Sequence, residues 1–372
     1  MSQSTPHIQA ILERAASGGR VSREEALHLW RKAELHDLAR AAHELRLRRA
    51  PADVVTYVVD RNINYTNVCV CGCQFCAFFR APGKAGGYVL SQDELGRKIE
   101  ETLALGGTQI LLQGGHHPDL PLSWYEELLR FIKSNYPIHV HAFSPPEVVH
   151  LAKLSGLTTA QVVARLKAAG LDSIPGGGAE ILVDRVRSEV SPNKCGAAEW
   201  LRVMEEAHRQ GLRTSATMMF GHVETGEERI AHLLALREVQ DRTGGFTAFI
   251  PWTFQPDNTA LSARVPAKQP ATAYLRFLAL SRIVLDNFAN LQVSWVTMGP
   301  KIAQLALFHG ANDFGSTMIE ENVVAAAGVS FLMSEEEIRG LIADAGFTPR
   351  RRLMNYTPAP EPQARTAEET LS

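Results

Sequence analysis

Residues 67–78 read NVCVCGCQFCAF and contain four of the five cysteines of this chain. Cys69, Cys73 and Cys76 have the spacing C-x3-C-x2-C, with an aromatic residue just before the last of them. Three thiolates this close together suit three corners of a cubane iron–sulfur cluster, which has four irons. One iron is then left without a protein ligand, and an open coordination position is what distinguishes catalytic from structural metal sites. The stretch therefore predicts a catalytic [4Fe-4S] centre.

Other interpretations of the same cysteines are possible. Zinc bound by Cys69, Cys71, Cys73 and Cys76 is one, although zinc sites usually draw their ligands from two separated pairs. A disulfide framework does not fit a long chain without a secretory signal. Cys71 is either an inert neighbour or a residue that replaces Cys69 or Cys73 in a misassembled cluster. Cys195 lies far away in sequence and is expected to be an ordinary small residue.

Length and composition fit an enzyme with one large domain. The chain has 372 residues, 45% of them hydrophobic, and a formal net charge of -2. This charge does not favour binding to nucleic acid or to an anionic membrane surface. No apolar run approaches the roughly 20 residues needed to span a bilayer. The N-terminus lacks a charged region followed by an apolar one, so we expect a cytoplasmic protein.

Strand-like and helix-like segments alternate along most of the chain. Helix starts are indicated by Ser22 with Glu25, Ser91 with Glu94, and Thr225 with Glu228. The expected strands are 62–65, 108–112, 138–143, 171–174, 214–220, 246–250, 292–296 and 311–314. Eight strand–helix units have the period and size of a TIM-type (βα)8 barrel. We therefore expect an N-terminal helical extension over 1–50, a barrel over 51–356 and a disordered tail over 357–372.

Polar residues follow most of the expected strands, at the end where active sites of such barrels lie. His117, His141, His222 and Glu147 form one group of candidate acid–base or substrate-binding residues. Each is equally compatible with a satisfied core or loop position. Aromatic residues near the same ends would suit an apolar cavity or plain barrel core; they are Phe78, Phe79, Trp252 and Phe254.

The cysteine spacing resembles that of the radical S-adenosylmethionine (SAM) superfamily. Longer blocks are similar to the futalosine-pathway enzymes of menaquinone biosynthesis within it, over roughly residues 50–356. These blocks include NINYTNVC (62–69), CQFCAFFR (73–80), GGTQILLQGG (106–115), HVHAFSPPE (139–147), LDSIPGGGAEIL (171–182) and GGFTAFIPWTFQP (244–256). The resemblance implies a radical SAM barrel with a [4Fe-4S] cluster on Cys69, Cys73 and Cys76.

The resemblance also implies how SAM is bound. The open iron would be chelated by the amino and carboxylate groups of SAM. Gly114 and Gly115 occupy the place of the glycine pair whose backbone contacts the SAM amino group. His116 stands where the superfamily pattern has glutamate, which departs from it. Glu180 would accept hydrogen bonds from the SAM ribose or amine, with a solvated loop acid as the alternative.

For the reaction, the resemblance implies cyclisation of dehypoxanthinyl futalosine. A 5'-deoxyadenosyl radical would take hydrogen from C4', the carbon radical would add to the benzoate ring, and a proton and an electron would then leave. A one-electron reductant such as flavodoxin or ferredoxin is the expected partner. The substrate carboxylate makes Lys301 and Arg80 candidate contacts. Aminofutalosine synthase or deazaflavin synthase chemistry is the nearest alternative, and a non-catalytic zinc or iron–sulfur protein is another.

Overall fold

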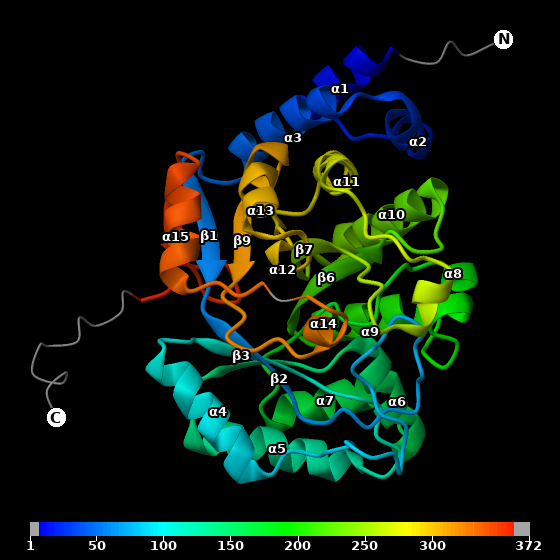
Figure 1. Ribbon diagram of the computed structural model, residues 1–372, viewed down its shortest axis with the longest axis vertical. Coiled ribbons are helices and arrows are strands. Elements are labelled where there is room, and N and C mark those ends of the chain that lie inside the picture. Colours follow the sequence, from blue (N-terminus) through cyan, green and yellow to red (C-terminus); the bar gives the residue numbers. More distant parts are fainter. Residues whose placement is uncertain (1–6, 330, 361–372) are drawn as a thin grey trace, which may run out of the picture.

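The computed structural model describes residues 7–329 and 331–360. Its first part consists of three helices at one end of the molecule (Figure 1), namely α1 (Ile8–Ala16), α2 (Arg23–Lys32) and α3 (Leu35–Arg49). The predicted capping box at Ser22 and Glu25 is confirmed at the start of α2. Leu38 and Leu45 lie on the buried face of α3, which packs against a helix near the end of the barrel, α11 (Ala271–Val284).

Parallel strands form the centre of the molecule. Seven of them make one sheet in sequence order: β2 (Asp60–Asn64), β3 (Gln109–Gln113), β4 (His139–Ala142), β5 (Ser173–Ile174), β6 (Arg213–Phe220), β7 (Phe246–Thr253) and β8 (Asn290–Leu291). A second sheet has the order β10 (Thr348–Arg351), β1 (Val54–Val58) and β9 (Asp313–Ser316). β1 runs into β2 with one residue, Val59, between them.

Backbone hydrogen bonds join β9 to the end of the seven-stranded sheet on one side and to β1 of its own sheet on the other. The amide of Val293 donates to Asp313 O at 3.0 Å, and the amide of Asn312 donates to Leu291 O at 3.1 Å. On the other side, the amide of Thr317 donates to Val58 O at 3.0 Å. The wall therefore closes through β9, and the prediction of a TIM-type barrel is confirmed.

Helices surround this barrel as the alternating pattern predicts. Those after the early strands are α4 (Gln92–Ala104), α5 (Leu122–Asn135), α6 (Pro145–Ser155), α7 (Thr159–Ala169), α8 (Asp184–Val190), α9 (Ala197–Arg209) and α10 (Gly226–Thr243). The later helices are η1 (Ala260–Ala263), α11, α12 (Trp295–Met298), α13 (Pro300–Ala306), η2 (Leu307–His309), α14 (Val323–Ala326) and α15 (Glu335–Asp344). The predicted capping boxes at Ser91 and Thr225 are confirmed.

Part of one predicted strand is helical. The run 292–296 is rich in β-branched and aromatic residues, which favour strands. In the structure β8 contains only Asn290 and Leu291, and Trp295 begins α12. The indole of Trp295 donates to Ser316 O at 2.9 Å, so tertiary contacts with the segment after β9 outweigh the local preference. The strands β1 and β10 were not among those predicted, and the predicted tail lies outside the described residues from 361 onward.

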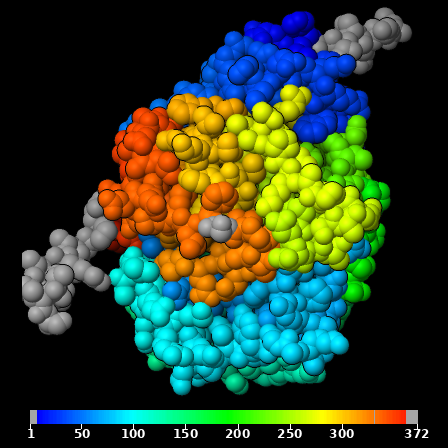
Figure 2. All heavy atoms as spheres, in the orientation of Figure 1, coloured from blue at the N-terminus to red at the C-terminus, as the bar shows by residue number. Residues whose placement is uncertain are grey.

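Among the described residues, no helix is long and apolar enough to cross a membrane. The segment that carries α14 lies across the middle of one face of the barrel, as Figure 1 shows. In the space-filling view its orange atoms fill the centre of that face, between cyan atoms of the early helices and yellow atoms of the later ones (Figure 2). This segment covers the cavity inside the barrel, because Val323 and Val324 both line that cavity.

Candidate active site

The loop that carries the cysteines leaves the carboxyl end of β2 and is fixed by backbone hydrogen bonds. The amide of Cys69 donates to Arg80 O at 2.9 Å, and the amide of Val70 donates to His116 O at 3.1 Å. Further along, the amide of Gln74 donates to Val190 O at 2.9 Å. The loop is thereby attached to the segments after β3 and β5, although these are far apart in sequence. Backbone groups at the carboxyl end of the barrel therefore hold the cysteine loop in place.

The exposure of the three expected cluster ligands differs. Cys73 is 6% exposed, while Cys69 and Cys76 are partly exposed. The described residues contain no group of three or more His, Cys, Asp and Glu side chains gathered as ligands of a single ion. A cubane does not need such a group, because each thiolate binds a different iron. Three soft donors on one short loop at the mouth of the barrel fit a [4Fe-4S] cluster.

Lys194 lies beside this loop and was not identified from the sequence. Its ammonium group is 3.0 Å from Glu180 Oε1 and 5.1 Å from the ring centroid of Phe75. Burial alone lowers the pKa of Lys194, but the nearby charges of Cys73 and Glu180 outweigh it and raise this pKa. Burial raises the pKa of Cys73 to about 12, and Lys194 opposes this shift. Lys194 is thus a fixed cation next to the thiols.

Cys71 has partners of its own. It is 1% exposed, and its sulfur lies 3.1 Å from Nδ1 of His116. The side-chain amide of Asn193 donates to Cys71 O at 3.0 Å. Burial holds the pKa of His116 well below its usual value, so this imidazole is neutral. His116 and Asn193 therefore hold Cys71 within the protein, although it stands between two expected ligands.

The glycine pair after β3 is packed against the cysteine loop. A Cβ on Gly115 would lie 2.2 Å from Val68 O and 2.9 Å from Cys69 Cβ. A Cβ on Gly114 would lie 2.4 Å from the Tyr65 ring. These contacts leave no room for a side chain, so glycine is required at both positions to bring β3 next to the loop. The close approach of backbone here is to the loop that bears the expected cluster ligands.

Glu147 is hydrogen-bonded to Tyr65 and Gly114, which belong to this packed region. Its Oε1 accepts hydrogen bonds from the Tyr65 hydroxyl at 2.6 Å and from the Gly114 amide at 3.2 Å. Its Oε2 accepts one from Ser144 Oγ at 2.5 Å. Burial raises the pKa of Glu147 to about 7, against the effect of these hydrogen bonds. Glu147 is not among the cavity-lining residues, and its contacts position Gly114 and Tyr65.

Besides Glu147, two more of the four candidate acid–base groups stand apart from the cavity. The side chain of His222 is buried; its Nε2 lies 3.0 Å from Met219 O and its Nδ1 lies 3.3 Å from Glu224 Oε2. His117 is partly exposed, and its Nδ1 accepts a hydrogen bond from the Asp119 amide at 3.1 Å. Neither His222 nor His117 lines the cavity, whereas His141 does.

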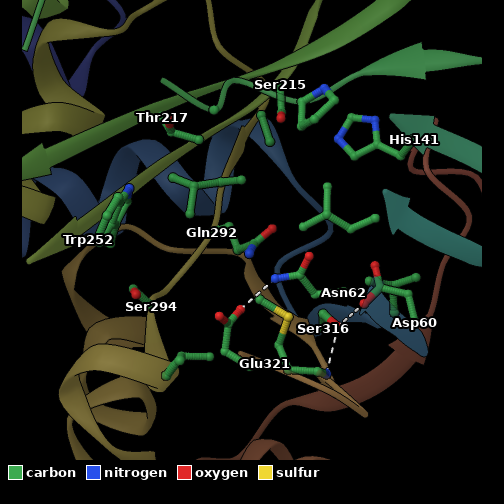
Figure 3. A pocket seen from close by; sticks show the side chains of 18 of the residues that line it. Asp60, Asn62, His141, Ser215, Thr217, Trp252, Gln292, Ser294, Ser316 and Glu321 are labelled. Atoms are coloured by element: carbon green, nitrogen blue, oxygen red, sulfur yellow. Dashed lines mark hydrogen bonds between the residues drawn. The ribbon is translucent and has the colours of Figure 1, made fainter. Parts of the chain in front are cut away.

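The cavity inside the barrel has a volume of about 280 Å³. This is close to the lower end of the ~300–1,000 Å³ found for small-molecule sites. His141, Glu180 and Trp252 line it, the last being one of the four aromatic residues expected there. Figure 3 shows the polar side chains that point into it from several strands: Asp60, Asn62, Ser215, Thr217, Gln292, Ser294, Ser316 and Glu321. Glu180 thus lines the cavity and also pairs with Lys194, which lies beside the cysteine loop.

The walls carry many neutral hydrogen-bonding groups. The carbonyl oxygens of the Asn62 and Gln109 side chains are buried without a partner among the described residues. Arg352 lines the cavity, but Asp313 occupies its guanidinium. Lys301 and Arg80, which were expected to contact a substrate carboxylate, are exposed and do not line the cavity. A polar ligand would therefore meet mostly amides and hydroxyls.

Glu321 is a second functional candidate that the sequence did not reveal. It follows β9, and its Oε2 accepts a hydrogen bond from Asn62 Nδ2 at 2.8 Å (Figure 3). Its Oε1 accepts from the amides of Val323 and Val324 at 2.7 and 2.9 Å. Burial raises the pKa of Glu321. Its place just after a barrel strand is the signal that would have suggested it.

Comparisons with known proteins show the family of this chain. Residues 63–236 match the radical SAM superfamily, and residues 243–365 match the CofH/MqnC C-terminal region. The chain belongs to the radical SAM superfamily and is an enzyme of that class, whose members use a [4Fe-4S] cluster and SAM. Cyclic dehypoxanthine futalosine synthase of Streptomyces coelicolor is 47% identical to it, covering 94% of this chain and 88% of that protein. The same enzyme of Halalkalibacterium halodurans is 46% identical, covering 94% of each chain.

A relative with another name is also close. A 5-amino-6-(D-ribitylamino)uracil–L-tyrosine 4-hydroxyphenyl transferase of Methanosarcina barkeri is 43% identical, covering 93% of this chain and 92% of that one. Among solved structures, the FeFe-hydrogenase maturase HydG of Carboxydothermus hydrogenoformans has a TM-score of 0.74 at 18% identity. The structural match covers 94% of this chain and 80% of HydG, and it supports the fold.

Proposed function

We propose that this radical SAM enzyme cyclises dehypoxanthinyl futalosine in menaquinone biosynthesis. The observation that carries the proposal is 46–47% identity to two cyclic dehypoxanthine futalosine synthases along 94% of the chain. The site is consistent with it, because a loop of three closely spaced cysteines opens beside a polar cavity. Fold alone would not support a particular reaction, since one barrel hosts many chemistries.

In this proposal Cys69, Cys73 and Cys76 hold a [4Fe-4S] cluster. Together with SAM, such a cluster supplies a 5'-deoxyadenosyl radical once a one-electron reductant, such as flavodoxin or ferredoxin, has reduced it. Lys194 places a positive charge beside the thiolates and shares Glu180 with the cavity. Gly114 and Gly115 let the end of β3 come close to the loop. The same backbone is our candidate for contact with the SAM amino group.

The cavity wall would bind and orient the substrate. Glu180 at one end suits the hydroxyls of the SAM ribose, while the side-chain carbonyl oxygens of Asn62 and Gln109 offer acceptors for the hydroxyls of a polyol. A reactive carbon radical also needs a site without water or stray hydrogen donors. The segment that carries α14 supplies a cover over the cavity, and Trp252 supplies an apolar wall. His141 is the candidate base.

The test is an anaerobic incubation of the reconstituted enzyme with SAM, dithionite and dehypoxanthinyl futalosine, followed by mass spectrometry. We expect 5'-deoxyadenosine together with a product that is lighter than the substrate by two hydrogens. Cys73→Ser should abolish both, whereas Ser281→Ala, at a buried helix position outside the cavity, should form both at the wild-type rate.

Two results would contradict the proposal. If the loaded enzyme leaves SAM intact with this substrate, the cyclisation is wrong. If 5'-deoxyadenosine forms without the lighter product, the radical chemistry stands and the substrate is wrong. The next substrates would then be those printed in the name of the Methanosarcina relative, L-tyrosine and 5-amino-6-(D-ribitylamino)uracil.

A further inference from the structure

Three side chains in the barrel wall form a continuous hydrogen-bonded chain. Ser173 Oγ lies 2.7 Å from Nδ1 of His141 and 2.7 Å from Nε2 of His139. The two histidines are separated by one residue on β4, so both point to the same face of the strand. Ser173 on β5 is paired with His141 in the sheet register, which places its hydroxyl between the two rings.

We propose that His141, Ser173 and His139 form a relay that carries the proton released by the cyclisation out of the cavity. This inference rests on the proposed function and extends it, because the cyclisation must lose one proton from an enclosed site. Nothing else described above assigns a role to Ser173 or His139.

The inner end of the relay is His141. It is 7% exposed and lines the cavity, where Figure 3 shows its ring close to the other polar lining residues. Nδ1 is engaged by Ser173, and among the described residues no hydrogen bond occupies Nε2. Nε2 can therefore accept a proton from a bound molecule, while Nδ1 passes one on.

The outer end is His139, which is partly exposed, whereas Ser173 is 1% exposed. Next to it is an ion pair at the surface, with Lys133 Nζ 2.9 Å from Asp172 Oδ2. The side chains of Lys133 and Asp172 are 35% and 30% exposed. The chain thus runs from the cavity, through a buried hydroxyl, to a partly exposed imidazole.

The histidines have the protonation state that a relay requires. Burial lowers the pKa of His139 and holds that of His141 well below its usual value, so both rings are neutral at rest. A neutral imidazole carries a proton on one nitrogen and a lone pair on the other. It can accept on one side and donate on the other, as the serine hydroxyl between them also can.

The cyclised radical loses a proton and an electron by separate routes. When the cyclised radical becomes aromatic again, a ring C–H bond breaks and its electron pair stays with the ring. The proton goes to Nε2 of His141, the Nδ1 proton goes to Ser173 Oγ, and the hydroxyl proton goes to Nε2 of His139. The proton on Nδ1 of His139 then leaves to water. The unpaired electron would leave to a one-electron acceptor, a role that the oxidised [4Fe-4S] cluster would fill when held by Cys69, Cys73 and Cys76.

The experiment compares the wild type with Ser173→Ala in the anaerobic assay with dehypoxanthinyl futalosine. Both the cyclic product and 5'-deoxyadenosine are measured in the same samples. We expect the ratio of cyclic product to 5'-deoxyadenosine to fall about 10-fold or more, because a positioned acid–base group contributes ~10²–10⁴-fold. Ser173→Thr keeps a hydroxyl and should restore the ratio.

Two further variants separate a relay from a merely structural role. His139→Gln changes a residue that does not line the cavity, and it should lower the same ratio. Ser281→Ala removes a buried hydroxyl elsewhere and should leave the ratio unchanged. Iron content and SAM affinity should equal those of the wild type in all of these variants.

The relay is overturned if Ser173→Ala and His139→Gln keep the wild-type ratio. It is equally overturned if product and 5'-deoxyadenosine fall together, because that result describes a loss of the whole site. A wild type that makes 5'-deoxyadenosine but no cyclic product overturns the proposed function and the relay with it. An active wild type with unchanged variants overturns the relay alone.

Discussion

At the scale of single residues, neighbouring cysteines differ sharply in their surroundings. Cys71 is enclosed by His116 and Asn193, whereas Cys69 and Cys76 are partly exposed at the mouth of the barrel. Sequence spacing alone cannot make this distinction, since Cys71 lies between two expected ligands. In the structure Cys71 contacts segments distant in the chain, whereas burial alone does not separate it from the expected ligands, because Cys73 is also buried.

Replacing these cysteines one at a time tests the expected ligand set. Cys71→Ala should retain about four irons per chain after anaerobic reconstitution, because the cubane has its three ligands without it. Cys73→Ala should lose at least half of the iron and the visible absorbance of the cluster. Iron and sulfide analysis checks both. Equal iron loss in the two variants would contradict the assignment.

Glu147 gives a prediction about pH. Its pKa of about 7, against 4.5 for an ordinary glutamate side chain, means that the folded state binds more protons than the unfolded state between these values. Its contribution therefore makes the free energy of unfolding fall as pH rises from about 4.5 to about 7, by about 3 kcal/mol. Glu147→Gln should remove this part of the pH dependence.

The measurement is chemical denaturation of the metal-free protein at several pH values, for the wild type and for Glu147→Gln. The difference between the two isolates Glu147 from groups that both proteins share. Parallel pH profiles of the two proteins would show that Glu147 is not the group responsible.

At the scale of elements, one buried ion pair joins the C-terminal segment to the barrel and can be tested. We call this pair, Arg352 with Asp313, the latch. Arg352, which follows β10, donates two hydrogen bonds to the carboxylate of Asp313 on β9, one of them at 2.9 Å. Both side chains are buried. Arg352→Ala would leave a buried carboxylate unpaired, so the free energy of unfolding should fall by about 3–5 kcal/mol.

A matched control for the latch is available two residues away. Arg350 on β10 is exposed, and Arg350→Ala should change the free energy of unfolding by no more than about 0.5 kcal/mol. Urea denaturation followed by circular dichroism compares the two variants. A cost for Arg352→Ala as small as that for Arg350→Ala would contradict the importance of the latch.

Elements with local signals were the ones that the sequence predicted well. Capping boxes identify the starts of α2, α4 and α10 from sequence, because the capping residue and the glutamate that pairs with it lie three residues apart. β1 and β10 were missed, and Trp295 was assigned to a strand, because their structure depends on partners far along the chain. The site follows the same rule: the cysteines are contiguous, whereas Lys194 and Glu321 reach it only through folding.

At the scale of the whole molecule, cluster binding should order one region selectively. The cysteine loop is attached to Val190 and Asn193 across the barrel mouth, while the N-terminal helices pack on α10 and α11. Loading the cluster should slow amide hydrogen exchange about 10-fold or more in residues 67–80 and 190–195. Exchange in α3 should stay the same. Mass spectrometry of metal-free and loaded protein checks this, and uniform slowing along the chain would contradict it.

The closure of the barrel has a consequence for synthesis on the ribosome. β1 is flanked by β9 and β10, and both of these come from the last sixth of the chain. The cysteines emerge early, but the wall beside them cannot be completed until residues 313–352 have been made. Until then the barrel wall cannot close between β8 and β1. The cavity can therefore be enclosed only near the end of translation.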